Sequence, residues 1–524
     1  MKFRNILLIS MLVMLVCCVT AVSATDINST DDTVITDEIA VDDVSEIVEE
    51  AEIDEVDDDP VEEQQNPVTT GTINGQPWEN YVYNTTGYLK TNDNLNFSGD
   101  FYAQSFGNIK VDKNIIINAE NARFYNIGFD LSVSQITLNG GTFYFNESAA
   151  VNSVIYDLGS ENTINNTVMD ITAPENVDFY AINLNQPNGA QILNNNITYR
   201  ANYANPTNYN YVVKVLRGSN VKMIGNNITA YLPLKDVDYT NYTTRFPTID
   251  LDFVAGVAVE QSGNFLFDNN TLDVTATSRN GWYPTLDALL MVKSDNSNIT
   301  NNKIYERDNV TGVNQSNFLY AVDVYRCNYM LIDNNVIEIN TKGGNITVNG
   351  TGAAYGIQIT GPQFITTITN NNITTANNGP NLGIYVVNSQ ASTASIIKNN
   401  RINVTGRAGD NKYNLVSGME LQDTYAEVSG NVIVVNNTGE YTPGSTYAFG
   451  ISYCQNTTGP HAFSIDHNNV TVYNADYAVY LYEYWTSGSV NSNNLLTMVG
   501  NSTNKSGNYA VFADEDEVRV YDNS

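Results

Sequence analysis

One short pattern recurs through most of the chain and constrains its fold more than any other feature. A copy begins with an aromatic residue, a small residue and alternating apolar residues, as in 320–324, and continues after a gap with an Asn corner and an apolar run, as in 330–339. The corner Asn recurs at Asn195, Asn226, Asn270, Asn302, Asn335, Asn371, Asn400, Asn431, Asn468 and Asn494. These positions differ by 31, 44, 32, 33, 36, 29, 31, 37 and 26 residues, and a repeat of this length indicates a solenoid.

The alternation of apolar residues within each copy predicts strands with one buried face. No stretch with helical periodicity separates them, which excludes βαβ units and leucine-rich horseshoes. Three short strands per coil, each paired in parallel with the coils above and below, account for the pattern. We therefore predict an all-β chain, a right-handed parallel β-helix of about 11–13 coils.

The Asn corner has a physical explanation in this fold. Asn tolerates the left-handed backbone conformation, and its amide can both donate to and accept from the equivalent Asn of the next coil. The pattern therefore predicts an asparagine ladder along the stack.

On these residues, the coil resembles the parallel β-helix repeat of the pectate-lyase-like superfamily, and the wider chain resembles adhesin-like surface proteins of methanogenic archaea. The resemblance covers about residues 100–524 as a repeat and includes no catalytic signature. It implies that 320–324 and its equivalents form the first strand of each coil, followed by the second strand, the Asn corner and the third strand.

The ends of the chain differ from the repeat. Lys2 and Arg4 precede an apolar run (6–19) and small residues (22–24), which predicts a signal peptide over 1–24; an uncleaved membrane anchor is the alternative. Residues 25–66 form an acidic linker, since 26–65 hold 18 Asp and Glu and no Lys or Arg. We interpret 67–105 as an irregular entry and 106–524 as the β-helix, continuing or capped beyond residue 524.

The charge and this leader restrict the partners. A net charge of −33, of which −17 remains outside the leader and linker (39 acids against 22 bases), argues against nucleic acid. We expect a secreted or cell-surface protein with no membrane span after cleavage, contacting glycans or cell-surface components, with further C-terminal domains possible.

Catalytic candidates are few. The predicted outward column of the first strands holds Asp323 and Glu420, which lie three coils apart, roughly 14 Å, too far for a glycosidase pair. The column as predicted is Asn183, Lys214, Ala258, Met291, Asp323, Gln358, Tyr385, Glu420, Ser452, Tyr480 and Phe512. The best other cluster is Glu260, Lys293 and Arg326, on consecutive coils, either a site or a solvated ion-pair ladder. No cofactor and no metal ligand set is predicted, and nothing supports a Ca²⁺ site.

An aromatic cluster offers a binding surface. Tyr480, Tyr482, Tyr484 and Trp485 either stack on sugars or cover a loop edge. Asn-x-Ser/Thr sequons are dense, and several arise where the corner precedes an Asn-Ile-Thr strand, so their Asn should face water. Cys327 and Cys454 should stay unpaired, because four coil steps separate them by roughly 19 Å.

The leading functional hypothesis is a non-enzymatic secreted or cell-surface adhesin-like or envelope structural protein that binds glycans through an extended face. A polysaccharide lyase or glycoside hydrolase of the pectate-lyase-like fold is the alternative. A stalk that only spaces another domain from the envelope is a third possibility.

Overall fold

The computed structural model describes most of the repeat region, and its contacts form one compact unit, Thr69–Ser524. The described residues are 70–146, 148–174, 177–201, 210–236, 254–279, 284–308, 318–341, 353–361, 365–387, 393–408, 415–439, 447–454, 463–482, 490–500, 509–513 and 519–524. The predicted signal peptide and acidic linker lie outside the described residues.

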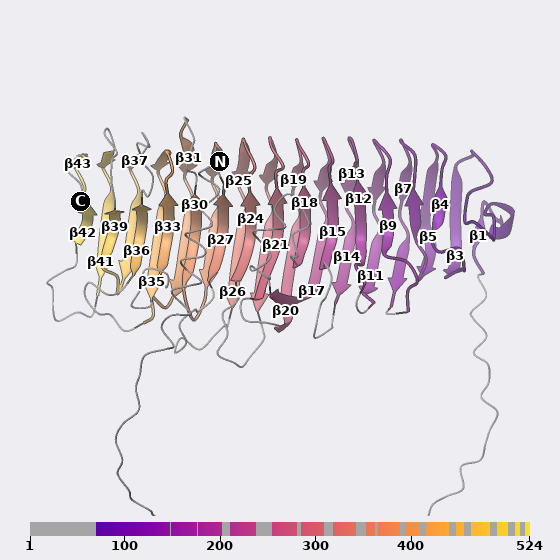
Figure 1. The fold of residues 1–524 in the computed structure, drawn as a ribbon, viewed down its shortest axis with the longest axis horizontal. Coiled ribbons are helices and arrows are strands. Elements are labelled where there is room, and N and C mark those ends of the chain that lie inside the picture. The colour runs from indigo at the N-terminus through magenta and orange to yellow at the C-terminus, as the bar shows by residue number, and fades with distance from the viewer. Residues whose placement is uncertain are drawn as a thin grey trace, which may run out of the picture. The chain divides into compact units, whose positions relative to one another are not determined.

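The repeat folds into a parallel β-helix, as predicted. Each coil contributes a first, a second and a third strand, and each strand pairs in parallel with its equivalents in the adjacent coils. Figure 1 shows the strands of successive coils lying side by side, from β3 (Leu95–Tyr102) in indigo to β43 (Arg519–Tyr521) in yellow.

The first strands form one continuous sheet, here called the first-strand sheet. Its members are β4 (Ile109–Val111), β6 (Phe129–Leu131), β9 (Ser153–Asp157), β12 (Tyr180–Asn185), β15 (Asn210–Leu216), β18 (Val254–Glu260), β21 (Pro284–Val292), β24 (Phe318–Tyr325), β27 (Ala354–Thr360), β30 (Asn381–Val387), β33 (Val416–Gln422), β36 (Ala448–Cys454), β39 (Tyr477–Tyr482) and β42 (Tyr509–Ala513).

The second strands precede the Asn corner. They are the first part of β5 (Ile116–Tyr125), β7 (Thr137–Asn139), β10 (Thr163–Asn165), β13 (Gln191–Leu193), β16 (Lys222–Ile224), β19 (Leu266–Asp268), β22 (Asn298–Thr300), β25 (Met330–Asp333), β28 (Thr366–Thr369), β31 (Ser395–Lys398), β34 (Ala426–Ser429), β37 (Phe463–Asp466), β40 (Val490–Ser492) and β43.

The third strands follow the corner. They are β3, the second part of β5, β8 (Thr142–Phe145), β11 (Val168–Thr172), β14 (Asn196–Arg200), β17 (Asn227–Asp236), β20 (Thr271–Arg279), β23 (Lys303–Asp308), β26 (Val336–Thr341), β29 (Asn372–Ala376), β32 (Arg401–Gly406), β35 (Val432–Asn437), β38 (Asn469–Tyr473) and β41 (Leu495–Val499).

The entry to the solenoid is short. β1 (Thr72–Ile73) pairs antiparallel with β2 (Gln76–Pro77) and with β3, and a 3₁₀ turn (Trp78–Asn80) places Trp78 in the core, 6.2 Å from the ring of Phe106. Strand β3, inside the range expected to be irregular, already pairs in parallel with β5.

Inward Ile, Val and Leu side chains fill the interior, and the small residue of the repeat has a steric cause. A Cβ at Gly356 would come within 2.6 Å of Ile373 Cγ2 on the facing third strand and 2.5 Å of the Gly383 carbonyl oxygen. Larger side chains cannot fit between coils at this position. From Gly256 onward the repeat keeps Gly or Ala at this place, as at Ala321, whereas two earlier coils carry Val154 and Val212.

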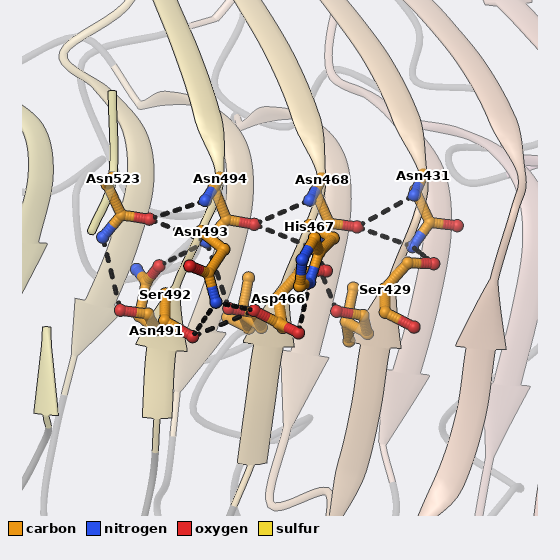
Figure 2. Close-up of polar contacts among 12 residues, drawn as sticks. Ser429, Asn431, Asp466, His467, Asn468, Asn491, Ser492, Asn493, Asn494 and Asn523 are labelled. Carbon is orange, nitrogen blue, oxygen red and sulfur yellow. Dashed lines mark hydrogen bonds and ion pairs between the residues drawn. The ribbon is translucent and has the colours of Figure 1, made fainter. Parts of the chain in front are cut away.

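The predicted asparagine ladder is present. The Asn302 side-chain Nδ2 donates to Asn335 Oδ1 (2.9 Å), and Asn335 Nδ2 donates in turn to Asn371 Oδ1 (3.0 Å). The same bond joins the predicted positions from Asn195 to Asn494 and continues to Asn523; Figure 2 shows its last steps. Each ladder Asn from Asn195 to Asn494 is buried, and Asn335 Nδ2 also donates to the Ile299 carbonyl of the preceding coil.

The left-handed residue of the corner is not the ladder Asn, as the sequence interpretation assumed, but the residue before it. Asn334 has φ 56°, and Asn194, Asn370 and His467 adopt similar values. The corner thus divides two tasks between neighbouring residues: the first turns the backbone, and the second bonds along the stack.

The register separates the two cysteines of the solenoid as predicted. Cys327 is a buried free thiol just after β24, and Cys454 ends β36, four coils away. At ~4.8 Å per coil the separation is roughly 19 Å, beyond the reach of a disulfide.

Candidate functional site

The outer face of the first-strand sheet carries the residue types with which a β-helix could act on a ligand. The pairings place Asn183, Lys214, Ala258, Leu290, Asp323, Gln358, Tyr385, Glu420, Ser452, Tyr480 and Phe512 in one column. Leu290, and not the predicted Met291, occupies this column on β21. Met291 points into the core, in register with Val324.

Much of this face is less exposed to solvent than the alternation of side chains along each strand predicts. Ala258 and Leu290 belong to a second apolar cluster with Tyr180 and Tyr211, all of them buried. Asp323 and Glu420 are each only 7% exposed. A carboxyl in such surroundings loses the hydration that stabilises its charge, so its pKa rises.

The two carboxyls of the column behave alike. Burial raises the pKa of Asp323 to about 7, against the lowering effect of hydrogen bonds from Gln358 and the Val324 backbone; Gln358 Nε2 donates to Asp323 Oδ1 at 3.3 Å. Burial raises the pKa of Glu420 to about 7 as well, although Gln422 Nε2 donates to its Oε1 at 2.6 Å. Both carboxyls therefore keep their protons to a higher pH than exposed acids do.

Two further buried acids, Asp287 beside Asp323 and Glu306 beside Asp287, were missed by sequence reasoning. Asp287, on β21, is 1% exposed, and its pKa is raised well above the usual value by burial and by the charges of Asp323 and Glu306. Glu306 occupies an inward position of β23, where Ile339 stands in the next coil, and burial raises its pKa. Aligning Ala288 rather than Leu289 with Ala321 would have placed Asp287 in the column of Tyr320.

The predicted cluster of Glu260, Lys293 and Arg326 does not form one column. Glu260 ends β18, is buried and pairs with Val292. Lys293 and Arg326 follow their strands at a second left-handed corner, with φ 49° and 56°. The Arg326 guanidinium lies 5.0 Å from the ring centroid of Tyr325. The one-residue offset puts the acid and the two bases in different columns, and the two alternatives for these residues, a site or an ion-pair ladder, both stay predictions.

The aromatic candidates are placed only in part. Tyr480 lies on the outer face, within an aromatic stack formed with Phe449, Tyr477 and Phe512. The centroids of these three rings lie 4.7, 4.9 and 5.5 Å from that of Tyr480, at interplanar angles of 8°, 17° and 25°. Its faces are thus covered by neighbouring rings. Tyr484 and Trp485 lie outside the described residues, as does the side chain of Tyr482.

Neither a metal group nor a membrane span is found in the part of the chain that the structure describes. No three His, Cys, Asp or Glu side chains there are arranged to hold a metal ion. No helix there is long and apolar enough to cross a bilayer.

Similar folds occur among solved structures, at very low sequence identity. A periplasmic alginate epimerase is 11% identical, with a TM-score of 0.34, over 88% of this chain and 94% of its own. The DFA-IIIase of Arthrobacter chlorophenolicus A6 is 9% identical, with a TM-score of 0.40, over 77% and 88%. The Dettilon tailspike protein is 14% identical, with a TM-score of 0.34, over 74% and 62%.

No protein-family model matches the sequence, and no curated protein matches it. Similarity at the level of these three structures carries no information about activity. The parallel pairing of the strands themselves defines the fold as a parallel β-helix.

Proposed function

We propose that this protein is a secreted or cell-surface, non-enzymatic, adhesin-like protein that binds glycans along its first-strand sheet. One observation carries the proposal: each coil adds one residue to every column of the outer face, at a repeat of about 4.8 Å. A polysaccharide is itself a repeating ligand, so a repeating protein surface can contact several sugar units at once.

The chemistry of the column suits weak, repeated contacts. Gln358 and Tyr385 offer an amide and a hydroxyl group to sugar hydroxyls, and the Tyr385 hydroxyl is already oriented by donation to Gln422 Oε1 (3.3 Å). Since the rings of the aromatic stack cover one another, their edges and hydroxyls rather than their faces would meet a ligand. Each such contact contributes little alone, so affinity would come from their number.

The spacing of the carboxyls speaks against glycosidase chemistry by the Asp323 and Glu420 pair. Strands β24 and β33 are three coils apart, which separates these residues by roughly 14 Å. Glycosidase carboxyl pairs lie about 5–10 Å apart. Each of the two carboxyls is hydrogen-bonded to a Gln amide.

The same proposal includes the location of the protein and its kinship with adhesin-like surface proteins. The resemblance to adhesin-like surface proteins, the signal-peptide profile of 1–24 and the acidic block of 25–66 support export to the cell surface. The dense sequons support a glycoprotein.

The test is a glycan array probed with the full chain. The double variant Tyr480→Ala with Phe512→Ala should lose most of the binding signal, while Tyr473→Ala, an exposed tyrosine of the third strand β38, should keep it. The double variant Lys293→Asn with Arg326→Asn should also keep the binding signal. Asn is chosen because it tolerates the left-handed backbone conformation at these two positions. Circular dichroism confirms that each variant is folded. Equal loss in the Tyr473 control, or no loss in the double variant, would contradict the proposal.

A hydrolase remains the second candidate, because Asp287 and Asp323 lie on adjacent strands and the charge of Asp323, after burial, raises the pKa of Asp287. Such a pair is the arrangement from which acid and base roles can arise. Incubation of the wild type with polysaccharides, followed by assay of new reducing ends or unsaturated products, tests it. Cleavage that disappears in Asp287→Asn and in Asp323→Asn would replace the adhesin proposal with the enzyme.

A further inference from the structure

The residue after each ladder Asn forms a second outward column, at the start of the third strand. In register, this third-strand column reads Val168, Asn196, Asn227, Thr271, Lys303, Val336, Asn372, Arg401, Val432, Asn469 and Leu495. All of these side chains are exposed except that of Thr271, which is half-buried. The column lies next to the ladder corner and not on the first-strand sheet.

Four members of this column are sequon asparagines. Asn196, Asn227, Asn372 and Asn469 are each followed by an inward Ile or Val and then by a half-buried Thr. Because side chains alternate along a strand, the Asn amide and the Thr hydroxyl of each sequon share the outward face. The structure thus presents four equivalent acceptor groups at one corner of the coil.

Exposed aliphatic side chains lie directly beside these asparagines. Val168 pairs with Asn196, Val336 pairs with Asn372, and Val432 and Leu495 flank Asn469. These four side chains are 37–50% exposed. A sugar attached to the neighbouring Asn would cover them with the apolar face of its ring.

Two of the acceptors are in contact although 31 residues separate them. Asn227 Nδ2 donates to Asn196 Oδ1 at 3.0 Å, across a single coil step. A hexosamine with its substituents is wider than one such step of about 4.8 Å. By contrast, Asn372 and Asn469 are three steps apart, roughly 14 Å, which leaves room for both.

We propose that the third-strand column carries a row of N-linked glycans: one on either Asn196 or Asn227, one on Asn372 and one on Asn469. The inference rests on the proposed export of the chain, because N-glycosylation takes place outside the cytoplasm. The Asn Nδ2 forms a bond to the anomeric carbon of an oligosaccharide carried on a polyprenyl (di)phosphate. The bond from that carbon to phosphate oxygen breaks, the lipid phosphate leaves, and the amide gives up one proton.

Transfer occurs before folding, since the backbone of a folded third strand is bonded on both sides. The fold then decides which modified chains can reach the native state. An outward sugar is compatible with the coil, whereas two sugars on Asn196 and Asn227 would force adjacent coils apart. The glycans would also stay off the first-strand sheet, leaving the proposed binding face open.

The experiment uses the full chain, exported behind a leader of the expression host and together with an oligosaccharyltransferase that accepts Asn-x-Thr. The host leader separates this test from the question of where the protein itself is located. Glycopeptide mass spectrometry of the folded, protease-resistant fraction gives the occupancy of each site. Asn84, in an exposed turn sequon, reports that the transferase is active.

We expect occupied Asn372 and Asn469, and no folded molecule with sugars on both Asn196 and Asn227. The variant Asn196→Gln should keep the glycan count and raise the occupancy of Asn227. In contrast, Asn372→Gln should lower the count by one and leave Asn469 unchanged. Folded molecules modified at both Asn196 and Asn227, or none of the four sites occupied while Asn84 is, would overturn the inference. Neither outcome depends on glycan-array binding, so a failure of the proposed function remains distinguishable.

Discussion

The ladder corner and the outer face of the first-strand sheet are built from the same repeat but obey different rules. At the corner, every coil from Asn195 to Asn494 supplies the same side chain for the same bond. On the outer face, one column passes from Lys214 through Asp323 to Tyr480. A position that must bond to its own copy cannot vary, while a position that only faces outward can. The constant column holds the stack together, and the variable column is where a ligand can be distinguished.

Breaking the constant column should have the largest effect. Asn335→Ala removes two donated and two accepted side-chain bonds at a buried site, so the Asn302 N–H, Asn302 Nδ2 and the Ile299 carbonyl lose this partner. The backbone N–H of residue 335 still donates to Asn371 Oδ1. We expect a loss of about 3 kcal/mol in the free energy of unfolding, measured by urea denaturation.

The matched control is Asn340→Ala, an exposed asparagine of the same coil on β26. Its unfolding free energy should stay within about 0.5 kcal/mol of the wild type. If the two variants unfold at the same urea concentration, the ladder does not stabilise the stack.

The buried carboxyls of the variable column should cost stability as the pH rises. The folded pKa of Asp323 is about 7 and that of an unfolded Asp is about 3.9, so between these values only the folded state keeps the proton. The stability that the protonated Asp323 carboxyl contributes is fully present below about pH 4 and is lost as the pH rises through 7. Asp323→Asn should remove this contribution and gain roughly 2 kcal/mol over the wild type between pH 5 and pH 8.

The check is a series of denaturation curves across that pH range. Glu338→Gln, on the half-buried outward side of β26, is the control and should leave the shape of the profile as in the wild type. A profile of Asp323→Asn parallel to that of the wild type would mean that the Asp323 carboxyl is ionised in the folded protein.

The aromatic stack should contribute a smaller amount. Tyr480→Leu keeps an apolar side chain but removes the ring contacts with Phe449, Tyr477 and Phe512. Ring pairs contribute about 0.5–1.5 kcal/mol beyond their buried area, so we expect a loss of about 1 kcal/mol in thermal or urea unfolding. Tyr473→Leu serves as the exposed control. No difference between these two variants would show that the rings do not stabilise one another.

The smallest effect is expected at a column in which a thiol and a hydroxyl already accept equivalent hydrogen bonds in successive coils. The Cys327 thiol accepts from the Ser294 N–H, just as the Ser294 hydroxyl accepts from the Ser262 N–H one coil earlier. Cys327→Ser should therefore change the unfolding free energy by no more than about 0.5 kcal/mol. Denaturation of the reduced protein measures it, and a loss above about 2 kcal/mol would show that the sulfur fills space that a hydroxyl cannot.

The sequence predicted the constant column well and the variable column less well, for physical reasons. The ladder positions hold the same residue type in successive coils, so their register could be predicted directly from the sequence. The left-handed residue, however, proved to be the one before each ladder Asn. On β21 the run 288–292 is apolar throughout and offers no alternation to fix the register. The predicted register was wrong by one residue there. It placed Met291 on the outer face of the sheet and did not place Asp287 in the column of Tyr320.

Burial and ring packing could not be predicted from one strand at a time. Phe449 and Tyr480 belong to different columns, so their stacking emerges only when two coils are superposed. Glu306 stands in an inward column between Val274 and Ile339, and no pattern anticipates a charged residue there. The low exposure of Asp323 and Glu420 depends on what surrounds the sheet rather than on its own alternation.

The strand register has a mechanical consequence for the proposed role at a cell surface. Because each strand pairs only with its equivalents in the adjacent coils, tension along the stack is expected to peel off one coil at a time while the next remains closed. The coil between Asn302 and Asn335 spans 33 residues and would release about 110 Å of chain when it opens. Such a chain would lengthen in steps under shear and take up the load gradually, so that an attachment made at one end could survive a pull that would break a rigid rod.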